Sequence, residues 1–242
     1  MKTLFTELLY RPLYNLLVTL MDILPHADIG FAVILLTLFV KFILFPLSKQ
    51  SIKTQLILKE IEQPLKELKE KYKDKPQEQA QKTLQMYKDN NLNPFAGIFL
   101  VLIQLPVVIA LYLVFARAGL PTINPELLYS FVSIPESIQT TFLGFINLVE
   151  NKSWLVAVLV FITQSVQIRF SLPKQDASKI EGSEFAQEFM RGLHFQMKYI
   201  LPIITAAVSY SLISVVGLYW IVGNIFATLQ EIYFRKTLKN KN

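Results

Sequence analysis

One lysine stands inside an apolar run that is long enough to cross a membrane. Lys41 is the only charged residue between Ile29 and Leu47. A helix rises 1.5 Å per residue, so about 20 apolar residues cross a hydrocarbon core roughly 30 Å thick. A charge at that depth is costly unless it faces water or a polar partner, and such charges usually mark functional sites. Lys41 is therefore the first candidate functional residue.

Lys41 also has a simpler interpretation. It lies close to the end of the apolar run at Leu47, about 9 Å away along a helix. A lysine stem at that depth can extend to the membrane surface and leave its ammonium in water. The residues alone favour a functional cavity and this interfacial placement equally.

The composition is that of an integral membrane protein. Only 17% of the 242 residues are charged, against roughly 25% in an average soluble domain. Long apolar runs recur at 95–116, 153–168 and 199–230. The last run is too long for one span, so we expect two short helices with a break near Ser214–Gly217. The sequence predicts an all-α protein with five transmembrane helices.

These runs divide the chain into spans and connecting segments. The predicted spans are 29–47, 95–116, 153–171 and, for the fourth and fifth together, 199–234. The predicted connecting segments are an amphipathic helix at 1–28, a helical hairpin at 48–94, an outer loop at 117–152, an inner loop at 172–198 and a short basic tail at 235–242.

The basic residues alternate between these segments. Of the 24 Lys and Arg residues, 10 lie in 48–94, 5 in 169–198 and 4 in 231–242. Segments on the cytoplasmic side of a membrane are enriched in Lys and Arg. The distribution therefore predicts five spans with the N-terminus outside and the C-terminus in the cytoplasm.

Two connecting segments have helical periodicity. Leucines recur at helical spacing in 1–28, which is typical of a helix lying on the membrane surface. In 48–94 an apolar stripe breaks at Asp74-Lys75-Pro76 and then resumes, which predicts two antiparallel helices of coiled-coil character. Pro64 should kink the first of them. By charge, this hairpin is either a solvated surface or a docking surface for anionic lipid heads or a protein.

The sequence shows no signature of catalysis. It contains no cysteine, no metalloprotease motif, no nucleophile elbow and no nucleotide-binding loop. We expect no enzyme activity, no metal and no cofactor. What remains is a set of polar residues at membrane depth, which suits a hydrated, mildly positive groove. Its members are Lys41, Gln104, Gln164, Gln167, Ser209, Ser211 and Asn224.

Several short stretches form an ordered set of motifs over about 29–236. The most distinctive runs from Val40 to Ser48 (VKFILFPLS). Others are Gln63-Pro64, Tyr87-Lys88, Asn93-Pro94, Ile103-Gln104-Leu105-Pro106, Ala110-Leu111-Tyr112, Leu201-Pro202 and Leu218–Asn224. Each is weak alone, but in this order, and with the hairpin between the first two spans, they resemble the YidC/Oxa/Alb family of membrane-protein insertases.

The resemblance implies how the protein works. Members of that family enclose a hydrophilic groove with five helices, and a groove cation attracts the polar extramembrane segment of a client. The client span then leaves along the third and fifth helices. By resemblance Lys41 is the groove cation, Gln104 lines the groove, and Trp220 and Asn224 lie near the groove or the exit path.

Two departures from the family pattern stand out. The usual groove residue is Arg, which stays charged in any protein environment, whereas Lys41 acts as a dependable cation only in a hydrated groove. The usual Pro-x-Gly break between the last two spans is replaced by Ile213-Ser214-Val215. The chain resembles the short bacterial form without a large outer domain, which implies a bacterial plasma membrane.

The sequence thus predicts a monomeric insertase that works without nucleotide hydrolysis. Its expected partners are nascent membrane-protein clients, the lipid bilayer and, by resemblance, the ribosome, a targeting receptor and the Sec translocon, with no nucleic-acid recognition. The alternative is a small-solute transporter or channel that uses Lys41 to bind an anion. A third possibility is an assembly factor that only holds client helices.

Overall fold

The computed structural model describes residues 2–24, 28–92, 96–116, 120–172, 192 and 194–239. Most of the predicted inner loop, the Asn93-Pro94 motif and the end of the tail lie outside these residues. The described elements are almost all helical, so the predicted all-α class is confirmed. In chain order they are α1 (Lys2–Phe5), η1 (Thr6–Tyr10), α2 (Arg11–Ile23), α3 (Ile29–Ile43), α4 (Phe45–Glu60), α5 (Glu62–Lys71), α6 (Pro76–Asp89), α7 (Ala96–Ala116), η3 (Pro125–Leu127), β1 (Thr141–Phe142), β2 (Ile146–Asn147), α8 (Trp154–Ser171), η5 (Gln196–Ile200), α10 (Leu201–Ser211) and α11 (Ser214–Lys239).

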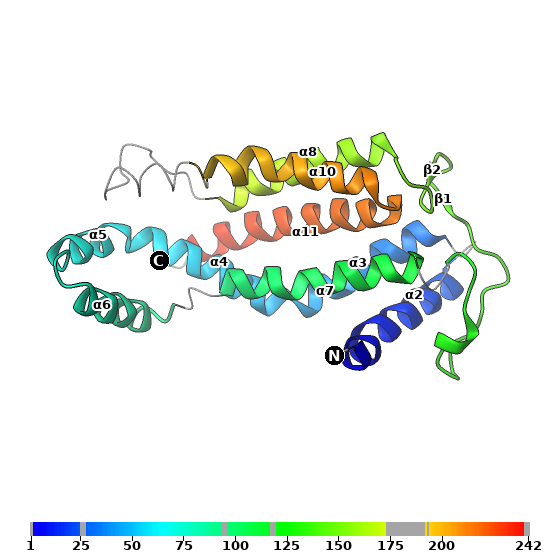
Figure 1. Ribbon diagram of the computed structural model, residues 1–242, viewed down its shortest axis with the longest axis horizontal. Coiled ribbons are helices and arrows are strands. Elements are labelled where there is room, and N and C mark those ends of the chain that lie inside the picture. The colour runs from blue at the N-terminus through cyan, green and yellow to red at the C-terminus, as the bar shows by residue number, and fades with distance from the viewer. Residues whose placement is uncertain are drawn as a thin grey trace.

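The helices form an elongated bundle. In Figure 1, α3, α7, α8, α10 and α11 run along the long axis, with the α5–α6 hairpin at one end and the β1–β2 hairpin at the other. We call these the hairpin end and the loop end. Helix α11 is central, because it packs on α3, α4, α7, α8 and α10.

A helix lies at each of the five predicted spans. Among the described residues, α8 and residues 214–237 of α11 are long and apolar enough to cross a membrane. The pair α3 and α4, bent by 60°, counts as a third candidate. In α7, residues 104–116 form a shorter apolar helix, and α10 has only 11 residues.

Two prolines fix the course of the chain from α3 into the hairpin. The 60° bend falls at Leu44, and Pro46 occupies the first turn of α4, where a missing N–H removes no helical bond. The predicted kink at Pro64 appears as a complete break at Ile61. A proline ring clashes with the carbonyl four residues earlier, and α4 ends at that residue, Glu60.

The N-terminal helix is anchored at the loop end. Tyr14, Leu17, Val18 and Met21 of α2 are fully buried, and α2 packs on α3 and α7. The buried Asn15 ties α2 to the long loop: its Nδ2 donates to the carbonyls of Arg11 (2.8 Å) and Leu127 (2.9 Å), and its Oδ1 accepts from the Tyr129 N–H (2.7 Å).

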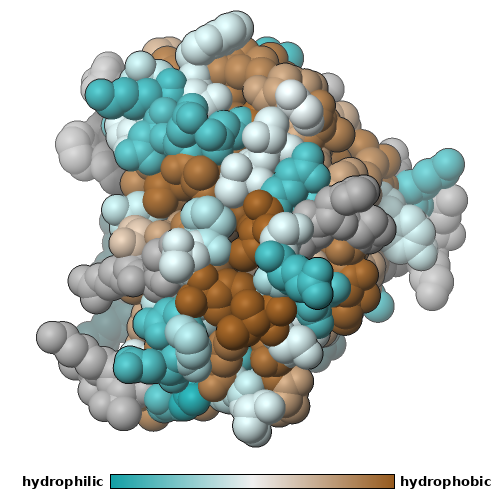
Figure 2. Space-filling model, turned by 90° about the vertical axis from the view of Figure 1, so that its right-hand side faces the viewer, coloured by the Kyte–Doolittle hydropathy of each residue, from teal (hydrophilic) through white to brown (hydrophobic). Residues whose placement is uncertain are grey.

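The loop between α7 and α8 has little regular structure. Its one helical element within residues 120–153 is the short 3₁₀ turn η3, and residues 128–132 continue without a helix. The β1–β2 hairpin was not anticipated. Figure 2 shows hydrophobic patches beside hydrophilic ones on this end of the molecule. Phe131 and Trp154 are among its exposed side chains, and aromatic residues in mixed surroundings are typical of a membrane–water boundary.

The break between α10 and α11 lies at Leu212-Ile213, upstream of the predicted Ser214–Gly217. The carbonyl of Glu150 accepts from the N–H (2.9 Å) and the hydroxyl (2.7 Å) of Ser214, so the loop before α8 starts α11 at this residue. Gly217 lies inside α11, where a Cβ would collide with Val156 of α8. Its role is therefore close helix packing.

Candidate functional site: a polar pocket inside the bundle

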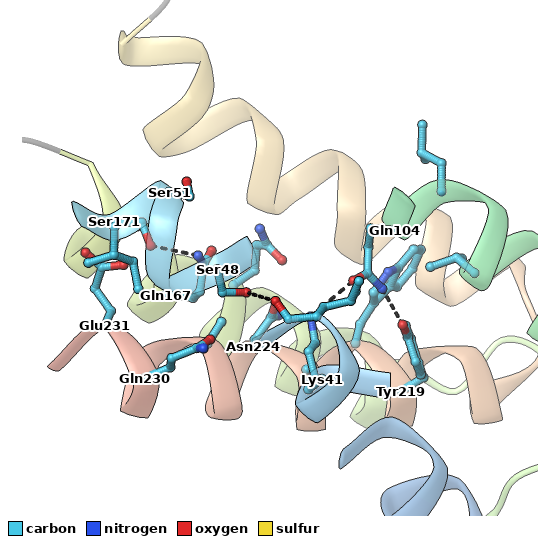
Figure 3. A pocket seen from close by; sticks show the side chains of 18 of the residues that line it. Lys41, Ser48, Ser51, Gln104, Gln167, Ser171, Tyr219, Asn224, Gln230 and Glu231 are labelled. Carbon is cyan, nitrogen blue, oxygen red and sulfur yellow. Dashed lines mark hydrogen bonds between the residues drawn. The ribbon is translucent and has the colours of Figure 1, made fainter. Parts of the chain in front are cut away.

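A pocket of about 450 Å³ opens between α3, α4, α7, α8 and α11. Figure 3 shows its polar side chains pointing in from several helices. The polar lining consists of Lys41, Ser48, Ser51, Gln55, Gln104, Gln164, Gln167, Ser171, Tyr219, Asn224, Gln230 and Glu231. Leu44, Ile52, Leu105, Val108 and Trp220 are among the other lining residues.

Helical periodicity brings these residues to the pocket. Residues three or four apart share one face of a helix. On α3 and α4 the lining positions 41, 44, 48, 51, 52 and 55 follow that spacing through the bend at Leu44. On α11 the positions 219, 220, 223, 224, 227, 230 and 231 do the same. The pocket therefore lies between two continuous helix faces.

Lys41 points into this pocket. Its Nζ donates a hydrogen bond to Gln104 Oε1 (3.2 Å), and Gln104 Nε2 donates in turn to the Tyr219 hydroxyl. The chain Lys41–Gln104–Tyr219 joins α3, α7 and α11, as Figure 3 shows. The ammonium is thus held by an amide inside the bundle.

Gly223 makes room for the lysine. A Cβ at this position would lie 3.2 Å from Lys41 Cε and 3.6 Å from Nζ. The first of these distances is tighter than ordinary van der Waals contact, so a side chain on Gly223 would press on the end of Lys41. Glycine on α11 therefore lets the lysine stem cross the pocket beside that helix.

An acid lies toward the hairpin end of the same pocket. The Glu231 side chain is 4% exposed, and its Oε1 accepts from Arg235 Nε at 2.6 Å. Glu231 follows Gly223 by eight residues, about 12 Å along α11. Along α11, the pocket thus has the Lys41 ammonium beside Gly223 and the Glu231 carboxylate, paired with Arg235, nearer the hairpin end.

The sequence did not point to this acid, because Glu231 directly follows the apolar run 199–230 and so does not interrupt an apolar stretch. The i, i+4 pair Glu231–Arg235, in phase with Gly223 and Ala227, was the available signal. Tyr219, Gln55 and Gln230 were also missed. Tyr219 reads as an aromatic member of the apolar run 199–230, Gln230 stands at the last position of that run, and Gln55 lies in the polar segment 48–94.

Of the eight predicted site residues, all but Ser209 and Ser211 of α10 line the pocket, namely Lys41, Gln104, Gln164, Gln167, Trp220 and Asn224. Two of them also bond to their neighbours. Gln167 Nε2 donates to Ser171 Oγ (2.9 Å), and Asn224 Nδ2 donates to Thr163 Oγ1 (3.3 Å).

Ser209 lies elsewhere. It is 2% exposed on α10, and its Oγ would be 2.6 Å from a Cβ on Gly217. Helix α10 packs on α8 and the start of α11, so it contributes no wall to the pocket. The expectation that Ser209 belongs to the groove is corrected: its small side chain permits close helix packing.

The pocket offers hydrogen bonding and charge. Within the described ranges, no group of three or more His, Asp or Glu side chains is placed to hold a metal ion. Amides, hydroxyls, the Lys41 ammonium and the Glu231 carboxylate surround a space large enough for several residues of a polar chain. Such a space suits a polar guest that must pass through an apolar layer.

The fold and the pocket define an all-helical membrane protein with a polar site inside its bundle. The family model described as 60Kd inner membrane protein matches residues 20–241. The chain belongs to that family.

Relatives support the assignment along most of the chain. "Membrane protein insertase YidC" of Oceanobacillus iheyensis is 26% identical over 217 residues, covering 88% of this chain and 76% of that protein. "Inner membrane ALBINO3-like protein 2, chloroplastic" of Chlamydomonas reinhardtii is 31% identical over 220 residues, covering 87% of this chain and 50% of that protein. "Membrane protein insertase YidC" of Clostridium tetani is 27% identical, with coverages of 88% and 84%.

Proposed function

We propose that this protein inserts client transmembrane segments into the bilayer, with the polar pocket as the passage for their polar extramembrane segments. The observation that carries the proposal is the Lys41 ammonium, held by Gln104 inside a pocket between helices. The family and the relatives named as insertases support it.

The pocket acts by lowering the barrier to transfer. A polar segment that enters lipid loses its hydrogen bonds to water, and each unsatisfied backbone group then costs several kcal/mol. The amides and hydroxyls of the pocket replace part of that water. Lys41 attracts acidic client residues, and the attraction needs no nucleotide hydrolysis. Helix α10 continues η5 without a break, so the helix Gln196–Ser211 is about 24 Å long; this is shorter than a hydrocarbon core of roughly 30 Å and favours a thinner bilayer beside the pocket.

The client span leaves along the lipid-exposed faces of α8 and α11. Val158, Phe161 and Ile162 of α8 are exposed, as are Ile225 and Leu229 of α11. An apolar span that slides from the pocket onto these side chains stays in contact with hydrocarbon-like surface throughout.

The orientation follows from charge. The α5–α6 hairpin belongs to the Lys-rich segment 48–94, so we place the hairpin end in the cytoplasm and the loop end, with the N-terminal helix, outside. The hairpin then faces the incoming chain and is the proposed contact for a ribosome, a targeting receptor or the Sec translocon. The proposed location is a bacterial plasma membrane, and the proposed state is a monomer.

Reconstitution tests the function. The purified protein is placed in liposomes, and a single-span client with an acidic outer tail is added. Protease protection then measures how much tail reaches the lumen. The proposal predicts that the client tail is protected from protease in liposomes that contain the protein and that little of it is protected in protein-free liposomes. Equal protection in both would refute it. A Lys41-dependent flux of small anions without client insertion would favour the transporter instead.

A further inference from the structure

Two amide groups in the pocket have buried atoms without a partner. Among the described residues, Gln55 Oε1 and Gln230 Nε2 are both buried and make no hydrogen bond. Gln230 is 8% exposed as a whole residue. Most buried polar side-chain atoms in proteins are paired, and an unpaired one is costly. These two atoms therefore indicate a guest that the pocket is built to receive.

The two atoms form a complementary pair. Gln55 lies on α4 and Gln230 on α11, two helices that pack on each other, and both side chains line the pocket. One offers an unused acceptor and the other an unused donor. A peptide group carries one N–H donor and one C=O acceptor, so polypeptide backbone supplies both of the groups that the two glutamines lack.

The shape of the pocket favours an extended chain. From Gly223, beside Lys41, to Gln230 the lining of α11 extends seven residues, or about 10 Å. An extended chain covers that length with about three residues at roughly 3.3 Å each. A client can therefore place an acidic side chain at Lys41 while its backbone passes Gln55 and Gln230.

We infer that Gln55 and Gln230 form a binding site for the extended backbone of the client, independent of the client's sequence. The inference rests on the proposed insertase function and assigns separate tasks within one pocket. Lys41 recognises acidic side chains, whereas the glutamine pair holds the feature common to all polypeptides.

The first test compares Gln55→Leu and Gln230→Leu with Gln81→Leu. Gln81 is exposed on α6, outside the pocket, so it controls for the loss of an amide. The clients are two single-span proteins with an acidic or an uncharged outer tail. Loss of one hydrogen bond lowers the initial insertion rate about five-fold. We expect that loss for both clients with both pocket variants and no loss with Gln81→Leu.

The second test changes the client backbone, so it does not depend on a variant's folding. A semisynthetic client series carries one ester in place of one amide at successive tail positions, which removes one N–H donor. At the position that passes Gln55, the ester slows insertion about five-fold by the wild-type protein, but adds no further loss with Gln55→Leu.

Three results would overturn the inference. Unchanged rates with both pocket variants would mean that water alone occupies the site. A loss confined to the acidic client would place the glutamines in charge recognition. If the rate losses caused by the client ester and by Gln55→Leu multiply, the client N–H and the Gln55 side chain do not bond to each other. In each case wild-type insertion stands, whereas no insertion by the wild-type protein would remove the proposed function and this inference together.

Discussion

Replacing Lys41 by alanine should impair clients according to the charge of their outer tail. The Lys41 ammonium is held in the pocket by Gln104 and lies against Gly223, so its removal leaves polar groups but no cation at that level. A carboxylate about 4 Å from an ammonium gains about 1 kcal/mol in bulk water and about 4 kcal/mol at an effective dielectric constant of about 20.

These energies set the size of the effect. Each 1.4 kcal/mol changes a rate about ten-fold, so the range runs from about five-fold to almost 10³-fold per carboxylate. Lys41 is mostly but not fully buried and lines an open pocket, so water reaches the ion pair and holds its energy below the upper end of the range. We expect a fall of about ten-fold in insertion of a client with one tail carboxylate, and no change for its amide counterpart.

The assay uses matched clients that differ only by Asp or Asn in the tail, inserted into liposomes that contain the wild-type, Lys41→Ala or Lys41→Arg protein. Lys41→Arg should retain at least half of the rate, since it keeps the charge. Thermal unfolding in detergent checks that both variants fold. Equal losses for the Asp and Asn clients with Lys41→Ala would refute the electrostatic reasoning.

Three further changes test the structure around the site. Tyr219→Phe removes the hydroxyl that accepts from Gln104 and should destabilise the protein by about 1 kcal/mol, seen as a lower midpoint in detergent unfolding; an unchanged midpoint would argue against this bond. Gly223→Leu should displace the end of Lys41 and slow acidic clients most, whereas Gly223→Ala should have a small effect; equal insertion by all three proteins would contradict the contact. Asn15→Leu leaves buried backbone groups of the loop unpaired and should destabilise the loop by about 2 kcal/mol. The loop should then be cleaved faster by protease while insertion activity is unchanged; cleavage at the wild-type rate would show that the Asn15 anchor is dispensable.

Polar residues in apolar runs predicted much of the pocket. Lys41, Gln104 and Asn224 stand out because each interrupts a hydrophobic stretch, and helical spacing brings them to one space. Gln55 and Glu231 do not stand out, since Gln55 lies in the polar segment 48–94 and Glu231 directly follows the apolar run 199–230. Their place in the pocket comes from the continuity of α4 with α3 and of α11 past the apolar run, which is a tertiary property.

Ser209 shows the opposite error. A serine in an apolar run suits a groove or a close helix contact equally well, and the neighbours decide which. Here Gly217 and Val156 face it across the junction of α10, α11 and α8. The start of α11 likewise depends on Glu150, 64 positions earlier in the chain, so local patterning placed that break a few residues too late.

The central claim is that the polar tail of the client passes through the pocket. The chain has no cysteine, so single cysteines report cleanly on contact. Asn224 lines the pocket, whereas the next residue, Ile225, is 48% exposed on the outside of the same helix. The two variants are therefore Asn224→Cys and, as the control, Ile225→Cys. A client with one cysteine in its acidic tail is stalled during insertion by each variant. An oxidant is then added, and disulfide cross-links between client and variant are measured. The account predicts a disulfide to position 224 and little to position 225. Equal cross-linking at both positions, or cross-linking at 225 alone, would contradict it.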